Sequence, residues 1–210
     1  MSIVAIDVDA QQTFTPLCPN ELPVAGGADI VAALNAQAAL AQYRVLTKDA
    51  HSPQAVWVVD DPKDSLQPLG LPNADLTWVA HAVPGTPGFE VLPGLPAVMD
   101  YDFVVYKGIE PDMHPYGACF HDYAERLSTG LIEWLKVKEA KTIILGGLAE
   151  DYCVKTTALQ LAKYGAWRVI VHLAATRGIA PETTVAARAE MVAAGVYLAT
   201  DMAALNTLVL

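Results

Sequence analysis

The chain has 210 residues, 53% apolar and 17% charged, with a net charge of −10 and a pI of about 4.8. This composition is typical of a globular protein, and the acidic balance argues against binding to nucleic acid or to a membrane surface. No apolar run approaches the ~18–20 residues needed to span a bilayer. The N-terminus lacks the basic start and cleavage site of a signal peptide, so we expect a cytoplasmic protein.

Strands and helices are predicted to alternate along the chain. Short apolar runs rich in β-branched residues predict strands at 2–9, 44–47, 102–106, 141–145, 168–173 and 196–199. Helical spacing predicts helices at 28–43, 127–138 and 152–163, after Pro181 and at the C-terminus. This alternation indicates an α/β three-layer sandwich, with a mostly parallel central sheet flanked by helices. We expect one domain over 1–210, with a long loop-rich insertion at about 49–100.

Functional residues are expected at the carboxyl ends of the predicted strands, where such sheets place their sites. Cys153 follows two glycines and falls in the first turn of a predicted helix. The helix dipole and free N–H groups there would lower the pKa of the thiol and could hold an oxyanion. The alternative is a small buried packing residue. Asp9 could take the thiol proton if Lys107 kept it ionised, although singly they could be a cap and a surface charge.

A second candidate cluster is Asp49 with His51. Residues two apart in an extended chain point to the same side, so this pair makes half a metal site. His81 is a distant candidate to complete it. The remaining histidines are interpreted as solvated or core residues: His114, His121 and His172.

The three cysteines are an odd number without CxxC spacing. This count argues against a disulfide framework and fits a reducing compartment. Cys18 and Cys119 are expected to be unreactive packing or surface thiols.

Six segments in order match the motifs of one family. They are D-A-Q-Q-T-F (9–14), L-P-V-A-G-G (22–27), K-D-A-H-S-P (48–53), W-V-A-H-A-V-P-G-T-P-G (78–88), K-G-I-E-P-D (107–112) with Tyr116, and G-L-A-E-D-Y-C-V (147–154). Over nearly the whole chain, they resemble the nicotinamidase (pyrazinamidase) branch of the isochorismatase-like cysteine hydrolases.

The resemblance implies a role for each catalytic candidate. Cys153 would be the nucleophile, Asp9 would accept its proton, and Lys107 would hold both groups in place. The backbone N–H groups of Ala149 and Cys153 would form the oxyanion hole, next to a cis peptide bond at Leu148–Ala149.

The resemblance also implies a metal and a substrate slot. Asp49, His51 and His81 would bind one divalent ion, Zn²⁺ or alternatively Fe²⁺ or Mn²⁺. The walls around a flat ring would be Phe14, Trp78, Tyr116 and Tyr152.

The activity implied is hydrolysis of nicotinamide to nicotinate and ammonia through a cysteine thioester, in NAD salvage. The expected partner is this small molecule, and a homo-oligomer is left open. One alternative is a related cysteine amidase acting on another small amide or ureido compound. Another is cleavage of an enol ether, which the histidine pair disfavours. A catalytically silent binding protein is the third, disfavoured because Asp9, Lys107 and Cys153 are all present.

The sequence departs from the family pattern in a few places. Thr13, Ala50 and Ala82 replace an acidic residue, a tryptophan and a cysteine. Asp7 competes with Asp9 for the role of the acid and is expected to point the same way, although the spacing to Phe14 favours Asp9. The insertion at 56–76 is expected to cover the site.

Overall fold

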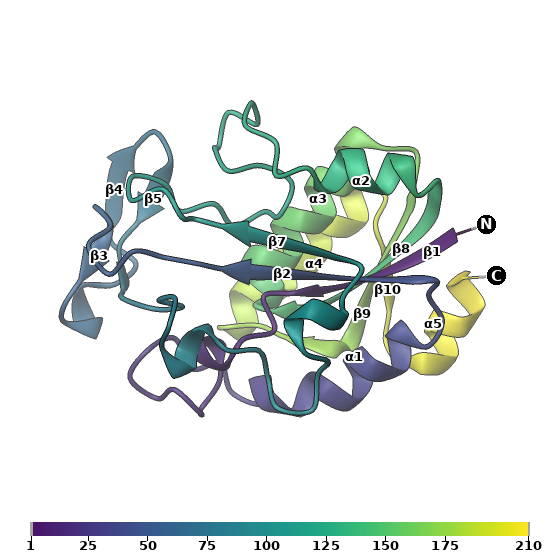
Figure 1. Cartoon of the computed structure of the whole chain (residues 1–210), viewed down its shortest axis with the longest axis horizontal. Coiled ribbons are helices and arrows are strands. Elements are labelled where there is room, and N and C mark those ends of the chain that lie inside the picture. The colour runs from purple at the N-terminus through teal and green to yellow at the C-terminus, as the bar shows by residue number, and fades with distance from the viewer. Residues whose placement is uncertain (1, 210) are drawn as a thin grey trace.

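The computed structural model describes residues 2–209 and is built on a six-stranded sheet (Figure 1). The strand order is β10-β9-β8-β1-β2-β7, and every pairing is parallel. These strands are β1 (Ser2–Val8), β2 (Tyr43–Asp49), β7 (Phe103–Lys107), β8 (Ala140–Leu148), β9 (Arg168–Arg177) and β10 (Tyr197–Ala199). The central strands β1 and β8 are largely apolar because helices cover both of their faces. The predicted α/β class is confirmed.

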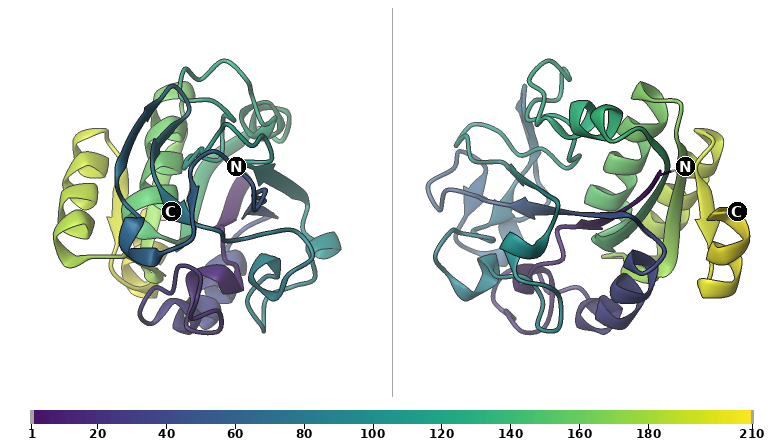
Figure 2. Two further views of the ribbon diagram at one scale, coloured as in Figure 1. Left: turned by 90° about the vertical axis from the view of Figure 1, so that its left-hand side faces the viewer. Right: turned by 45° about the vertical axis from the view of Figure 1, so that its right-hand side comes forward.

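Helices cover both faces of the sheet (Figures 1 and 2). They are α1 (Val31–Ala38), α2 (Leu131–Val137), α3 (Lys155–Tyr164), α4 (Pro181–Ala193) and α5 (Met202–Val209). On one face, α2, α3 and α4 bury Leu135, Leu161 and Met191 against β1 and β8. On the other, α1 and α5 bury Leu34 and Leu205. No helix among residues 2–209 is long and apolar enough to cross a membrane.

The boundaries of the first two predicted helices are wrong. The helix expected over 28–43 opens with a 3₁₀ turn at Gly27–Ile30 and ends at Ala38. Tyr43 already belongs to β2, where it pairs with Val4, so strand pairing overrides the helical pattern. The helix expected from 127 begins only at Leu131, because the preceding residues form loop contacts such as the bond from the His121 N–H to the Leu127 carbonyl.

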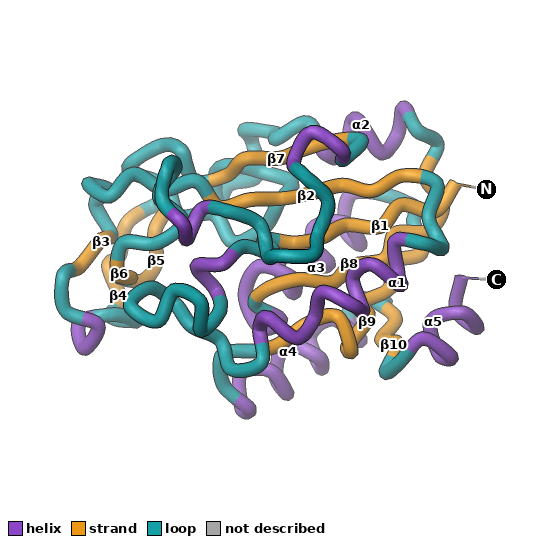
Figure 3. The backbone as a smooth tube through the Cα atoms, turned by 60° about the horizontal axis from the view of Figure 1, so that its bottom comes forward, coloured by secondary structure: helices purple, strands orange, loops and turns teal. Residues whose placement is uncertain are grey.

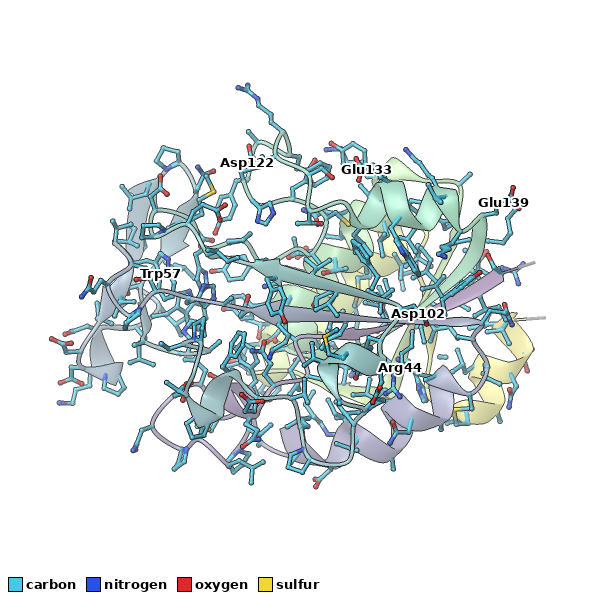
Figure 4. All side chains as sticks on the ribbon, viewed as in Figure 1. Arg44, Trp57, Asp102, Asp122, Glu133 and Glu139 are labelled. Atoms are coloured by element: carbon cyan, nitrogen blue, oxygen red, sulfur yellow. The ribbon has the colours of Figure 1, made fainter. Side chains whose placement is uncertain are left out.

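The segment between β2 and β7 forms two small sheets beyond the carboxyl ends of the central strands (Figures 1 and 3). β3 (Val58–Val59) pairs with β6 (Trp78–Val79), and β4 (Pro68–Leu71) forms a hairpin with β5 (Ala74–Leu76). An apolar cluster of Ala55, Trp57, Ala74 and Trp78 holds them together. Figure 4 shows Trp57 beyond the carboxyl end of β2, with Arg44 near the other end of that strand. The segment therefore lies over the strand ends where functional residues were expected.

Asp7 and Asp9 have different surroundings, so the expectation that they point the same way is wrong. Asp7 accepts hydrogen bonds from Arg44 Nε at 2.8 Å and from the Tyr101 hydroxyl at 2.9 Å. Asp9 has a positive φ of 44°, which takes it out of the alternation that β1 imposes on its side chains. Burial raises the pKa of Asp7 to about 6, although Arg44 and Tyr101 oppose the rise.

Asp7 should make the stability of the fold depend on pH. A carboxyl whose pKa rises from 3.8 to about 6 on folding stabilises the protein fully below the lower value, and this contribution is lost as the pH rises through the higher one. Relative to Asp7→Asn, the wild-type free energy of unfolding should fall by roughly 2 kcal/mol between about pH 4.5 and pH 7. Urea unfolding of both proteins measures this change. Asp60→Asn, at an exposed aspartate, is the control, and a pH-independent difference for Asp7→Asn would contradict the assignment.

Candidate active site

The carboxyl ends of β1, β2 and β7 bring three charged side chains together. Lys107 ends β7 and pairs in register with Asp49, which ends β2, while Asp9 follows β1. The Lys107 ammonium lies 3.0 Å from Asp9 Oδ2, donates to Asp49 Oδ1, and donates to the Pro115 carbonyl at 3.0 Å. It also lies 3.7 Å from Cys153 Sγ. One buried ammonium thus contacts two carboxylates and a thiol.

The ionisation of these groups follows from burial and from their neighbours. Burial alone would lower the pKa of Lys107, but Asp49 and Asp9 hold it well above its usual range. Burial alone would raise the pKa of Asp49, but Lys107 and His51 hold it well below its usual range. Burial raises the pKa of Asp9, against the opposing charge of Lys107. Lys107 is therefore expected to stay protonated, and Asp9 binds a proton more readily than Asp49 does.

The thiol of Cys153 behaves differently from the prediction. Burial raises its pKa well above the ordinary value, and the two carboxylates add to the effect against the charge of Lys107. The expected lowering by a helix terminus is wrong, because desolvation outweighs it at a residue only 5% exposed. Reaction at this sulfur consequently needs a proton acceptor, and the carboxylate oxygen of Asp9 lies within 4.8 Å of it.

Two polar residues that sequence reasoning missed hold the acidic groups in place. Thr47 Oγ1 donates a 2.5 Å hydrogen bond to Asp9 Oδ1. The Gln11 side chain accepts from the Asp49 backbone N–H at 2.7 Å and donates to the Asp49 carbonyl at 3.0 Å. Gln11 lies in the 9–14 motif and Thr47 in a predicted strand. The sequence therefore placed both residues near the site but did not predict their hydrogen-bond partners.

Cys153 lies on a sharp bend between β8 and α3. Gly147 has a φ of 128°, and a Cβ there would lie 1.8 Å from the Val8 carbonyl oxygen, so only glycine lets β8 run against β1. The Leu148–Ala149 peptide bond is cis, as the family resemblance implies. Cys153 then falls in a π-helical turn, Glu150–Val154, and not in the first α-helical turn that was predicted.

Two acidic residues tie this turn to α4. Glu150 accepts from Arg188 Nε at 2.5 Å and from Nη2 at 3.0 Å. Asp151 accepts from the backbone N–H of Ile179 at 3.0 Å and from Thr183 Oγ1 at 2.5 Å. The turn that carries the nucleophile candidate is thus held against α4 by charge-assisted bonds.

Beside the carboxylates lies a group of buried histidines. The ring nitrogens of His51, His81 and His114 lie within 4.8 Å of one another, and Asp49 Oδ1 lies 3.5 Å from His51 Nε2. The rings of His51 and His81 bond through Nδ1 to the carbonyl oxygens of Gly108 at 3.0 Å and Val79 at 2.8 Å. Sequence reasoning proposed His51 and His81 but grouped His114 with His121 and His172. In the structure His114 lies beside His51 and His81, whereas His121 and His172 are not part of this group.

The donor set fits a divalent metal. Burial, followed by the charge of His51, lowers the pKa of His81 to about 3, which keeps that imidazole in the neutral, ligating form. His51 Nε2 is buried and has no hydrogen-bond partner among residues 2–209, so it lacks what an ion would supply. With Asp49, His51 and His81 offer two imidazoles and a carboxylate, which suit zinc or iron.

A narrow cavity joins Cys153 to His81 and His114. The four aromatic residues predicted to wall a flat ring all line it: Phe14, Trp78, Tyr116 and Tyr152. Leu22 and Ile179 also line it and were missed, because both come from loops without a recognisable pattern. Trp78 and Tyr152 meet edge to face at 85°, and the indole N–H of Trp78 donates to the Tyr116 hydroxyl at 3.3 Å. The cavity is therefore a largely aromatic slot with the Cys153 thiol at one side.

Comparisons with known proteins agree with this architecture. The family model described as the isochorismatase domain matches residues 3–202. The nicotinamidase/pyrazinamidase of Mycobacterium tuberculosis is 34% identical over 199 residues, covering 92% of this chain and 96% of that protein. PnC1 from L. infantum in complex with nicotinate has a TM-score of 0.80 at 27% identity, covering 97% and 94% of the two chains. The pyrazinamidase of Pyrococcus horikoshii in complex with zinc has a TM-score of 0.74 at 28% identity, covering 94% and 98%.

The fold and the matched family model define the class: the chain belongs to the isochorismatase family. Within that family of hydrolases it is related to the nicotinamidases, with 34% identity to the mycobacterial protein.

Gly108 should be needed for the orientation of His51. It has a φ of 72°, and a Cβ there would lie 2.2 Å from His51 Cε1. Gly108→Ala should therefore displace the imidazole and weaken zinc binding by at least about 10-fold, since even groups that only orient a ligand are worth that much. Calorimetric titration of metal-free protein with zinc measures the affinity.

Gly70→Ala is the matched control, because Gly70 has a similar φ of 65° but open space around it. Both variants should lose some stability to left-handed strain, and only Gly108→Ala should lose affinity. Equal zinc affinities would contradict the role given to Gly108.

Proposed function

We propose that this chain is an amidase that hydrolyses nicotinamide to nicotinate and ammonia. One observation carries the proposal: Lys107 contacts Asp9, Asp49 and Cys153 beside an aromatic slot that also reaches the histidines. Such a slot suits a flat heteroaromatic amide, whose carbonyl must be held over the sulfur. The mycobacterial relative and the nicotinate-bound neighbour support this choice of substrate.

The first half of the reaction forms a thioester. The Asp9 carboxylate takes the proton of the Cys153 thiol, and the ammonium of Lys107 balances the charge of the thiolate. The sulfur attacks the amide carbonyl carbon, and the backbone N–H groups of Ala149 and Cys153 stabilise the oxyanion. Asp9 then gives its proton to the amide nitrogen. The C–N bond breaks, ammonia leaves, and the acyl group stays on sulfur.

The second half releases the acid. Asp9, again a carboxylate, takes a proton from water as the hydroxyl oxygen attacks the thioester carbonyl. The C–S bond breaks, the thiolate regains its proton from Asp9, and nicotinic acid leaves and loses its proton to water to give nicotinate. Lys107 remains protonated throughout, which agrees with its raised pKa.

Asp49, His51 and His81 would hold one divalent ion, for which we propose zinc, with iron or manganese as alternatives. The zinc-bound relative from Pyrococcus supports this choice. When bound, the ion would offer a Lewis-acid position for the ring nitrogen of the substrate. Phe14 and Trp78 would then hold the plane of the ring.

The setting proposed for this reaction is NAD salvage in the cytoplasm. Cys18, Cys119 and Cys153 are all free thiols, as a reducing compartment favours. Residues 1–210 would act as one catalytic domain, with the 49–100 segment covering its active site.

Ammonia release from nicotinamide by the metal-loaded protein tests the proposal. We expect turnover that falls at least about 1,000-fold in Cys153→Ala and in Asp9→Asn, because loss of the nucleophile or its base removes the covalent route. Cys119→Ala removes a buried thiol outside the site and should leave turnover within a few-fold of wild type. Benzamide, which lacks the ring nitrogen, should be a much poorer substrate.

No release from nicotinamide by the metal-loaded wild type would overturn the substrate assignment. Turnover of other small amides that vanishes in Cys153→Ala would then support a related cysteine amidase. Turnover of none of them would support a binding protein.

A further inference from the structure

His114 lines the aromatic slot beside His81, although no sequence pattern predicted it there. It lies in the loop after β7, and its backbone is held on both sides: its N–H donates to the Asn73 carbonyl at 2.7 Å, and its carbonyl accepts from the Tyr123 hydroxyl at 2.9 Å. The side chain is only 4% exposed. The contacts of the β4–β5 hairpin therefore place this imidazole inside the site.

The ring of His114 has no polar partner. Neither Nδ1 nor Nε2 has a hydrogen-bond partner among residues 2–209. The ring packs at 4.3 Å from Trp57, stacks on His51 at 4.9 Å, and faces Trp78 at 5.8 Å between centroids. Burying a polar side chain without a partner costs on the order of 1–3 kcal/mol, so this arrangement calls for a ligand to at least one of the two nitrogens.

The neighbouring nitrogens indicate which ligand this is. One ring nitrogen of His114 lies within 4.8 Å of the corresponding nitrogens of His51 and His81. Two nitrogens bound to one ion at 2.0–2.1 Å are at most roughly 4.2 Å apart, so small side-chain rotations would bring all three onto one centre. Among residues 2–209, Asp49 is the only carboxylate within 4.0 Å of any of these three imidazoles. A cation bound here would therefore be held mainly by imidazole nitrogens.

We propose that His114 is a third imidazole ligand of the metal site, alongside Asp49, His51 and His81. This inference rests on the metal site of the proposed function, and it concerns the chain's own ligands rather than the reaction. Three imidazoles and one carboxylate favour zinc, cobalt or iron and disfavour magnesium and calcium, which prefer oxygen. A fourth protein ligand also leaves fewer positions for water or for a ring nitrogen.

The experiment measures metal binding without substrate. Metal-free wild type, His114→Phe, His51→Ala and His121→Ala are titrated with zinc against a competing chelator, and with cobalt while the visible absorption bands are recorded. Phenylalanine keeps a flat ring against Trp57 and Trp78 but offers no nitrogen. His121 lies outside the group and serves as the neutral control, while His51→Ala shows the effect of losing a ligand.

We expect His114→Phe to bind zinc at least about 10-fold more weakly than wild type, as loss of a ligand should cost no less than loss of a group that orients one. Its cobalt bands should shift in position or intensity, because they report the ligand set. His121→Ala should match wild type. Wild-type affinity together with unchanged cobalt bands in His114→Phe would overturn the proposal and leave His114 as a packing or slot residue.

Circular dichroism of the metal-free variants shows whether they fold, and His114→Gln replaces His114→Phe if the latter does not. Uptake of neither ion by the wild type would overturn the proposal whatever the ammonia assay shows. Three-histidine metal binding without ammonia release would leave the proposal standing and contradict only the substrate. A failure of the His114 proposal can therefore be distinguished from a failure of the substrate assignment.

Discussion

The buried ammonium of Lys107 is the constraint around which the site is built. Removing an ammonium from water costs several kcal/mol unless charges of opposite sign replace the lost hydration. Asp9 and Asp49 supply those charges, and they can reach Lys107 only because β1, β2 and β7 are neighbours that end at the same edge of the sheet. Cys153, which follows β8 on the other side of β1, reaches the same cation from the next strand end.

Asp49 connects this charged group to the histidines. The same oxygen accepts from Lys107 and lies 3.5 Å from His51 Nε2. When both carboxylates are ionised, they exceed the single positive charge of Lys107, so the buried group carries excess negative charge. A divalent cation among the histidines would offset that excess at Asp49 and leave Lys107 more fully engaged with Asp9. The metal site and the nucleophile would then be coupled electrostatically through one carboxylate, although different loops supply the surrounding residues.

The sequence predicted those features that depend on neighbouring residues and failed where distant contacts decide. Buried β-branched runs were enough to predict the parallel sheet and to place Asp9 and Lys107 at strand ends. The 28–43 pattern continues past Ala38, but the helix ends there and Tyr43 pairs with β1. The expectation that Asp7 and Asp9 point the same way was wrong. Period-2 alternation assumes an extended backbone, and Asp9, with its positive φ, is not extended.

The proposed metal ligands show the same division between local and distant information. Asp49 and His51 are two residues apart on one extended segment, so their spacing alone predicts that they act together. His114 has no such neighbour. Its place depends on a hairpin about forty residues earlier, through Asn73, and on Tyr123 in the following loop. The 56–76 insertion therefore helps to position His114, because the main-chain carbonyl of Asn73 accepts from the backbone N–H of His114. A residue held in this way is invisible to spacing rules and is recognised only from its unpaired nitrogens once the chain is folded.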